Sequence, residues 1–181
     1  MARWLLICRG PLSFFVTPAH CVLVLLFYLH ATLAAGTLFL HVVWGINLRS
    51  LNKLSIRIFS TLVKGLEEVG DSKRIAANDT FMAVVVECIG QHAEGRVFSV
   101  AHYGEEAGDA MRDPDVTFLV GENGKVHPLT FRNDYFGAEE VAVELHADGK
   151  LRVDEQVMYV LVDFCNGWMK SINEQQELGI V

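Results

Sequence analysis

Hydrophobic residues spaced three or four positions apart predict two amphipathic helices, one at residues 51–69 and one at residues 157–172. This spacing places apolar side chains on one face of a helix, so each helix is expected to bury a single stripe. Gly70 is a suitable end for the first helix, and Asp154 can cap the second by accepting hydrogen bonds from its free amides. The stripe expected on the second helix comprises Val157, Val160, Leu161, Phe164, Trp168 and Ile172.

Short apolar runs separated by turn residues predict about five β-strands between the two helices. The runs cover residues 81–89, 97–103, 116–120, 126–131 and 141–145. Asn123-Gly124 predicts a hairpin with a type I′ turn, because both central residues of that turn need positive φ. The stretch from Gly104 to Asp113 is expected to be a loop. Together these elements predict an α+β domain, an antiparallel sheet of about five strands flanked by an N-terminal and a C-terminal amphipathic helix.

An apolar segment at residues 1–48 precedes the predicted domain at residues 49–181. No Asp, Glu, Lys or Arg occurs among the 39 residues from Gly10 to Leu48. Since about 20 apolar residues suffice to cross a bilayer, the segment predicts a helix that tethers the domain to the inner membrane on its cytoplasmic side. Two other interpretations remain open: a signal peptide cleaved near residues 32–35, and a start site assigned too far upstream.

Charge divides the chain close to the same boundary. All 22 acidic residues follow Leu66, and residues 67–181 carry only nine basic ones, which gives this part a formal charge of −13. Such a domain should repel the phosphates of nucleic acids, so direct nucleic-acid binding is not expected. A protein partner with a basic surface is expected instead. The four cysteines contain no Cys-x-x-Cys pair, which favours small core residues in a reducing compartment over a disulfide framework.

Two polar stretches, residues 102–115 and 132–135, are candidate functional loops. The first combines a histidine with several carboxylates, the residue types that can bind a divalent metal, although the spacing does not fit a calcium loop and a solvated acidic loop is the alternative. Arg112 could hold a phosphate or carboxylate at two points. The second stretch suits a recognition loop. No cofactor is expected, and the candidate residues are His102, Tyr103, Asp109, Arg112, Asp113, Asn133, Asp134 and Tyr135.

Two segments of the chain resemble a small uncharacterised domain family found on bacterial plasmids and integrative conjugative elements. They are SVAHYGEEAGDAMRDPDVTF at residues 99–118 and LTFRNDYFG at residues 129–137, and the resemblance extends from about Leu51 to Leu178. It implies a bacterial cytoplasm but no activity. The polar positions that it carries over are the candidate residues above together with Gly108. Because such domains begin near the first amphipathic helix, the resemblance favours a mis-assigned start over a membrane anchor.

Two functional hypotheses follow, and the sequence leaves open whether the protein is an enzyme. The first is a non-catalytic protein-binding module that serves as an accessory protein of a mobile genetic element. DNA mimicry, in which carboxylates imitate phosphates toward a basic cleft, is one form of it. The alternative is a metal-dependent hydrolase or nuclease that uses His102, Asp109 and Asp113, together with Asp134. The enzyme hypothesis requires these side chains to converge in a cleft.

Overall fold

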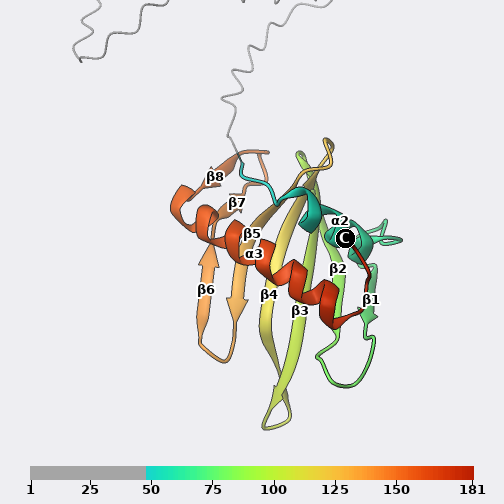
Figure 1. Cartoon of the computed structure of the whole chain (residues 1–181). Helices are drawn as coiled ribbons and strands as arrows, with labels where there is room; N and C mark the ends of the chain where they lie inside the picture. The colour runs from blue at the N-terminus through green and yellow to red at the C-terminus, as the bar shows by residue number, and fades with distance from the viewer. Residues whose placement is uncertain (1–47) are drawn as a thin grey trace, which may run out of the picture. The chain divides into compact units, whose positions relative to one another are not determined.

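Six antiparallel strands, a two-stranded hairpin and two helices make up residues 48–181, the part of the chain that the computed structural model describes (Figure 1). The elements in chain order are α2 (Lys53–Val63), β1 (Ser72–Ile75), β2 (Val84–His92), β3 (Gly95–Glu106), β4 (Asp109–Gly121), β5 (Val126–Asn133), β6 (Ala138–Val141), β7 (Val143–Leu145), β8 (Leu151–Val153) and α3 (Glu155–Gln175). Strands β1 to β6 form one sheet in chain order, while β7 pairs with β8. The predicted α+β class with a helix at each end is therefore confirmed, and the sheet has one strand more than expected.

The predicted membrane segment lies outside the described residues. Its three interpretations, an anchor, a cleaved signal and a mis-assigned start, concern residues 1–48, of which only Leu48 is described. Within residues 48–181, no helix is long and apolar enough to cross a membrane.

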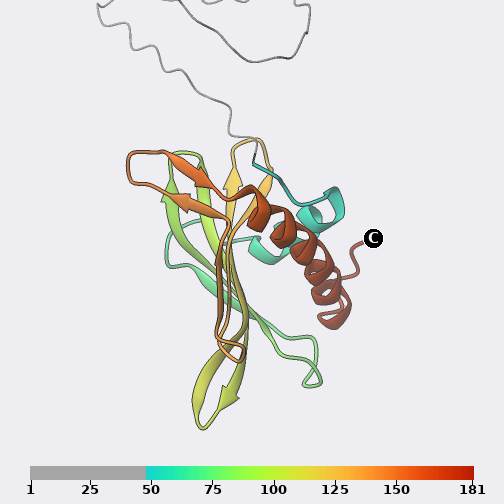
Figure 2. The same ribbon diagram turned by 90° about the vertical axis from the view of Figure 1, so that its left-hand side faces the viewer.

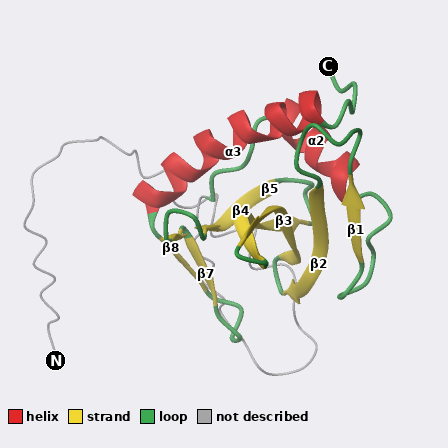
Figure 3. Ribbon diagram, turned by 90° about the horizontal axis from the view of Figure 1, so that it is seen from below, coloured by secondary structure: helices red, strands yellow, loops and turns green. Residues whose placement is uncertain are grey.

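Both helices cover the same side of the curved sheet (Figure 3). Asn52 caps α2, where its side chain accepts a hydrogen bond from the Ser55 amide at 2.9 Å. Asp154 caps α3 as predicted, because its carboxylate accepts from the amides of Gln156 and Val157 at 3.0 and 3.1 Å. The first helix ends at Val63, six residues before the predicted limit, since the chain turns at Gly65 with a φ of 85°.

The hydrophobic core lies between the sheet and the two helices. The ring of Phe59 on α2 meets that of Phe98 edge-on, with centroids 6.0 Å apart, and lies 5.0 Å from that of Phe118. Cys88 and Cys165 are buried free thiols, and burial raises the pKa of the Cys165 thiol. Within residues 48–181, the cysteines therefore serve as small core residues, as the sequence predicts.

Helix α3 buries only part of the predicted stripe, since Leu161 and Ile172 are buried as predicted. Its buried residues are Met158, Leu161, Cys165, Met169 and Ile172. Val160 is instead 63% exposed and Phe164 is 40% exposed. The helix carries two adjacent apolar stripes, both with helical spacing, and the sheet can cover only one of them. The prediction was wrong for Val160 and Phe164 because periodicity identifies an apolar face but not which of two overlapping faces packs against the sheet.

The stretch from Gly104 to Asp113, predicted to be a loop, instead continues β3 and β4 as a long hairpin. Glu106 pairs with Asp109, and the two residues between them, Ala107 and Gly108, have φ values of 54° and 91°. Two central residues with positive φ are the mark of a type I′ turn. Polar side chains suit these strands because most of the hairpin is exposed to solvent, so its backbone pairing does not require an apolar pattern.

The Asn123-Gly124 hairpin is confirmed, but its turn differs from the predicted type. Only Gly124 has positive φ, at 73°, and its amide donates to the carbonyl of Gly121 at 2.9 Å. A type I turn followed by a left-handed glycine has this pattern. The predicted strand at residues 141–145 divides between β6 and β7. The short strands β1 and β8 were not predicted, because neither has a continuous apolar run.

Candidate functional site

The two predicted polar stretches lie side by side, because β4 pairs with β5. Asp115 is the register partner of Arg132, and the Asp134 amide donates to the Arg112 carbonyl at 3.0 Å. Successive side chains of a strand point to opposite faces of a sheet, so the candidate residues divide between the helix-covered face and the opposite face. We call the group on the opposite face the polar cluster; it comprises Ser99, Tyr103, Arg112, Asp115, Thr117, Thr130, Arg132 and Asp134.

Asp134 is the centre of the polar cluster. Its carboxylate accepts from the Arg112 amide at 3.0 Å, from Arg132 Nε at 2.8 Å and from an Arg112 terminal nitrogen at 3.4 Å. The hydrogen bond from the Arg112 amide, followed by the one from Arg132, lowers the pKa of Asp134. Arg112 Nε also lies 3.5 Å from Asp115 Oδ2. The guanidinium that could have held a ligand at two points is therefore already held by two carboxylates of the same chain.

Further polar residues complete the cluster on neighbouring strands. Ser99 Oγ donates to Asp115 Oδ1 at 2.7 Å, and Thr117 Oγ1 lies 2.6 Å from Thr130 Oγ1. Burial, followed by the charge of Asp115, raises the pKa of Tyr103. Sequence reasoning missed the serine and both threonines because they lie inside runs identified as strands. Their alternation with buried Phe98 and Phe118 was the available signal, since it places polar side chains away from the helices.

On the helix-covered face, the candidate residues join the structural interior. The Asn133 amide nitrogen donates to Asp113 Oδ1 at 2.7 Å, and its oxygen accepts from the Phe136 amide at 3.2 Å. His102 Nδ1 lies 3.2 Å from the Ala83 carbonyl, and the imidazole meets the Trp168 ring edge-on with centroids 5.6 Å apart. Burial lowers the pKa of His102, against smaller opposing contributions from backbone hydrogen bonds and from Asp113. The arrangement favours a neutral histidine.

The two remaining candidates lie along the β3–β4 hairpin. The Tyr135 hydroxyl donates to the Glu105 carbonyl at 3.3 Å, and its ring occupies the space where a side chain at Gly104 would lie. Asp109 lies at the exposed tip and pairs with Glu106. Glu106 in turn lies four residues beyond His102 along β3. At the usual rise per strand residue, His102 and Glu106 are therefore about 13 Å apart along the strand.

His102 and Asp109 therefore do not converge, so the set required by the enzyme hypothesis is not brought together. Among residues 48–181, no group of three or more His, Cys, Asp or Glu side chains is arranged to hold a metal ion.

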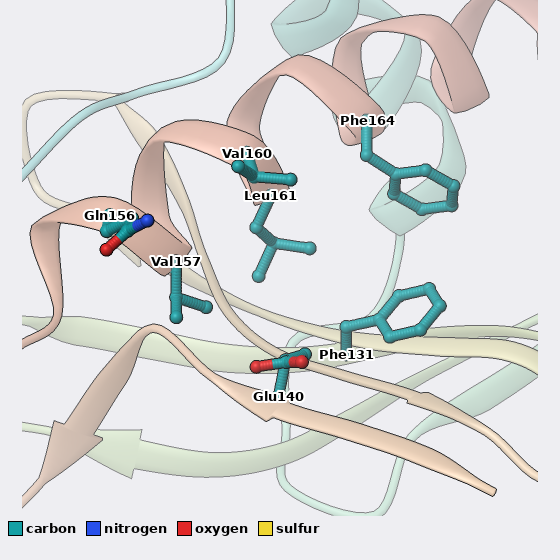
Figure 4. A pocket seen from close by; sticks show the side chains of 7 residues that line it. All are labelled: Phe131, Glu140, Gln156, Val157, Val160, Leu161 and Phe164. Atoms are coloured by element: carbon teal, nitrogen blue, oxygen red, sulfur yellow. The ribbon is translucent and has the colours of Figure 1, made fainter.

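A groove of about 390 Å³ separates α3 from the strands β5 and β6 (Figure 4). The residues that line it are Phe131, Glu140, Gln156, Val157, Val160, Leu161 and Phe164. The Phe131 and Phe164 rings meet edge-on with centroids 5.2 Å apart, and they lie at one end of the groove. Sequence reasoning missed this groove because Val157, Val160 and Phe164 were assigned to the core. The second apolar stripe of α3 was the signal that could have revealed it.

Comparison with models of protein families matches residues 57–178 to a family described as a domain of unknown function (DUF6908). The chain therefore belongs to this family. No curated protein and no solved structure shows significant similarity to the chain. The family match agrees with the resemblance to an uncharacterised domain, and it assigns neither an activity nor a genetic context.

Proposed function

We propose that this domain is a non-catalytic protein-binding module, and that it serves as an accessory protein of a mobile genetic element. The groove beside α3 is the observation that carries the binding role. It presents the exposed side chains of Val160 and Phe164 together with Phe131. Contiguous apolar side chains at a concave surface, bordered by polar residues, are typical of sites that bind other proteins.

The state of the candidate polar residues supports the same proposal. Arg112, Asp134 and Arg132 are engaged with one another, and Asn133 is engaged with Asp113. These contacts hold the end of β5 against β4. In contrast, Glu140 in the groove has no ion-pair partner among residues 48–181. The groove thus offers a partner both unused apolar surface and an unused charge.

The charge of the domain favours a basic partner. Residues 67–181 carry a formal charge of −13, and acidic residues lie in or next to the groove at Glu140 and Glu155. Opposite charge across an interface accelerates association and disfavours acidic competitors. The partner we propose therefore has a basic surface with apolar side chains in its centre.

DNA mimicry is the specific form that the β3–β4 hairpin favours. In Figure 2 this yellow-green hairpin projects beyond the other strands, and its end exposes Glu105, Glu106 and Asp109. Carboxylates on a rigid ribbon can compete with phosphates for a basic cleft. The full-length protein should then retain a nuclease or restriction enzyme at low salt, and duplex DNA should displace it. The triple variant E105Q/E106Q/D109N should not retain that enzyme; equal retention by this variant argues against mimicry.

Site-specific photo-cross-linking tests the binding role. A photoreactive phenylalanine derivative replaces Val160 or, as a control, Val69, which is similarly exposed at 61% but lies away from the groove. In cells that naturally express the protein, position 160 should give a discrete adduct whose partner has a basic surface segment. Position 69 should not give it. Identical adducts from both positions, or none from position 160, would contradict the proposal.

A further inference from the structure

We propose that the groove binds an extended segment of the partner, which adds as a new strand to the outer edge of β6. This inference rests on the proposed function and specifies the partner: a strand whose side chains on the groove side are a basic residue between two apolar ones. The basic side chain would face Glu140, while the apolar ones would fill the groove along α3.

The position of β6 makes strand addition possible. It is the last strand of the six-stranded sheet, and among residues 48–181 only β5 pairs with it. Figure 1 shows β6 at the left margin of the sheet, with no strand beyond it. The backbone groups on the outer side of an edge strand are unpaired, and an incoming peptide can use them as a template.

The register of β6 places the groove beside this edge. Glu140 pairs with Phe131, whose ring packs on Phe164 of α3, so Glu140 lies on the helix-covered side (Figure 4). Neighbouring strands lie about 4.8 Å apart, and every second side chain points to the same face. A strand added to β6 therefore directs alternate side chains toward α3, beside Val157 and Val160.

Charge selects the side chain opposite Glu140. The neighbouring Glu139 is the strand-register partner of Arg132 on the other face, and its charge contributes to raising the pKa of that arginine, although the two form no ion pair. Glu140 has no such cation among residues 48–181. Opposite charges on facing positions of adjacent strands stabilise the pair, so Lys or Arg is favoured there.

The same charges argue against a second copy of this chain as the occupant. Antiparallel pairing of two β6 strands would bring Glu139 and Glu140 of one copy against those of the other. Like charges directly opposite one another are destabilising, and charged edge strands resist this kind of self-association.

The probe that tests this inference is a capped seven-residue peptide with Val, Lys and Val at its second, fourth and sixth positions and Thr elsewhere. The pattern is palindromic, so it presents the same side chains whether it binds parallel or antiparallel. Binding to the full-length protein is followed by fluorescence anisotropy, and hydrogen exchange locates the site. We expect saturable binding and slower exchange at β6. No binding, or protection elsewhere without protection of β6, would overturn the inference.

Glu140→Gln and Glu139→Gln form the matched pair of variants. Both remove one negative charge from adjacent exposed positions, but only Glu140 faces the groove. Glu140→Gln should weaken peptide binding by about 1.5- to 5-fold, while Glu139→Gln should change it less. Equal loss in both variants would mean that general charge attraction, and not the Glu140 position, selects the peptide; that result would overturn the inference. Unchanged melting temperatures show that both variants are folded.

Backbone pairing and self-association complete the test. The same peptide with N-methylated amides cannot extend the sheet, and it should bind about tenfold more weakly if two hydrogen bonds are lost. Equal affinity would overturn the inference, as would a dimer of the full-length protein that protects β6. If position 160 cross-links to a partner but the peptide does not bind, strand addition fails and the protein-binding role stands. If neither occurs, both fail.

Discussion

The polar cluster and the groove differ in the partners of their side chains. In the polar cluster, Asp134 binds two arginines, and Asp115 binds Ser99. In the groove, Val160 is largely exposed, and Glu140 has no ion-pair partner within residues 48–181. A dense group of polar residues can thus serve to hold neighbouring strands together. An exposed apolar stripe with one carboxylate that lacks an ion-pair partner is the better candidate for binding.

The largest loss of stability is expected for Asn133→Ala, next to Arg132 and Asp134 of the polar cluster but on the helix-covered face. The side chain is buried and joins Asp113 to the Phe136 amide, so its loss leaves two polar groups without their partner. We expect a loss of about 1–3 kcal/mol in the free energy of unfolding. Val160→Ala, at an exposed position, should change it by less than about 0.5 kcal/mol. Urea denaturation measures both, and similar losses would contradict the contrast between a polar side chain that holds the strands together and an exposed side chain of the groove.

Asp134 should make the stability of the fold depend on pH. Its pKa is lower in the folded state than in the unfolded chain, so it stabilises the fold above its unfolded pKa, and this stabilisation is lost as pH falls through the folded value. The variant Asp134→Asn should therefore melt at a lower temperature than the wild type at neutral pH. The difference should shrink as the pH is lowered below the ordinary pKa of an aspartate. A constant difference in melting temperature between neutral and acidic pH would show that the charge of Asp134 does not stabilise the fold.

His102 gives a second pH effect, in a higher range. Burial lowers its pKa in the fold, so the unfolded chain binds more protons and stability falls as pH drops below the ordinary histidine pKa of about 6.5. His127 is shifted in the same direction by burial. The variant His102→Gln should flatten the decrease in melting temperature between pH 7 and 5 in part, and the double variant with His127→Gln should flatten it further. An unchanged slope would contradict a buried, neutral His102.

A gain in stability is expected at the hairpin tip, which belongs to neither region. Ala107 has a φ of 54°, a conformation that costs a residue with a Cβ atom about 1–2 kcal/mol. Asn tolerates this conformation better and is preferred before glycine in type I′ turns. Ala107→Asn should raise the free energy of unfolding by up to about 1 kcal/mol. Differential scanning calorimetry would detect the gain, and a lower melting temperature would mean that the alanine makes an unrecognised contact.

Local signals in the sequence were sufficient for much of the fold. Asp154 identified the start of α3, and Gly124 and Gly149 mark turns with φ values of 73° and 81°. Each of these features depends on a few neighbouring residues. The type I′ turn at Ala107 was missed because alanine is an unusual residue at positive φ.

The sites depended on contacts between distant residues, which a single sequence does not reveal. The bond from Ser99 to Asp115 spans two strands, and the pairing of Phe131 with Glu140 places the acid beside α3. The choice of Met158 over Val160 for the core depends on how the sheet meets the helix. Arg112 and Asp134 were both candidate residues, but the contact between them could be seen only in the fold.

Photo-cross-linking from each of the two regions decides which of them is the binding surface. The photoreactive residue replaces Val160 in the groove or Tyr103 in the polar cluster, which is 41% exposed and therefore accessible. We expect a discrete protein adduct from position 160, reduced by Glu140→Gln, and none from position 103. A discrete adduct from position 103 and none from position 160 would contradict this expectation, and would make the polar cluster the binding surface.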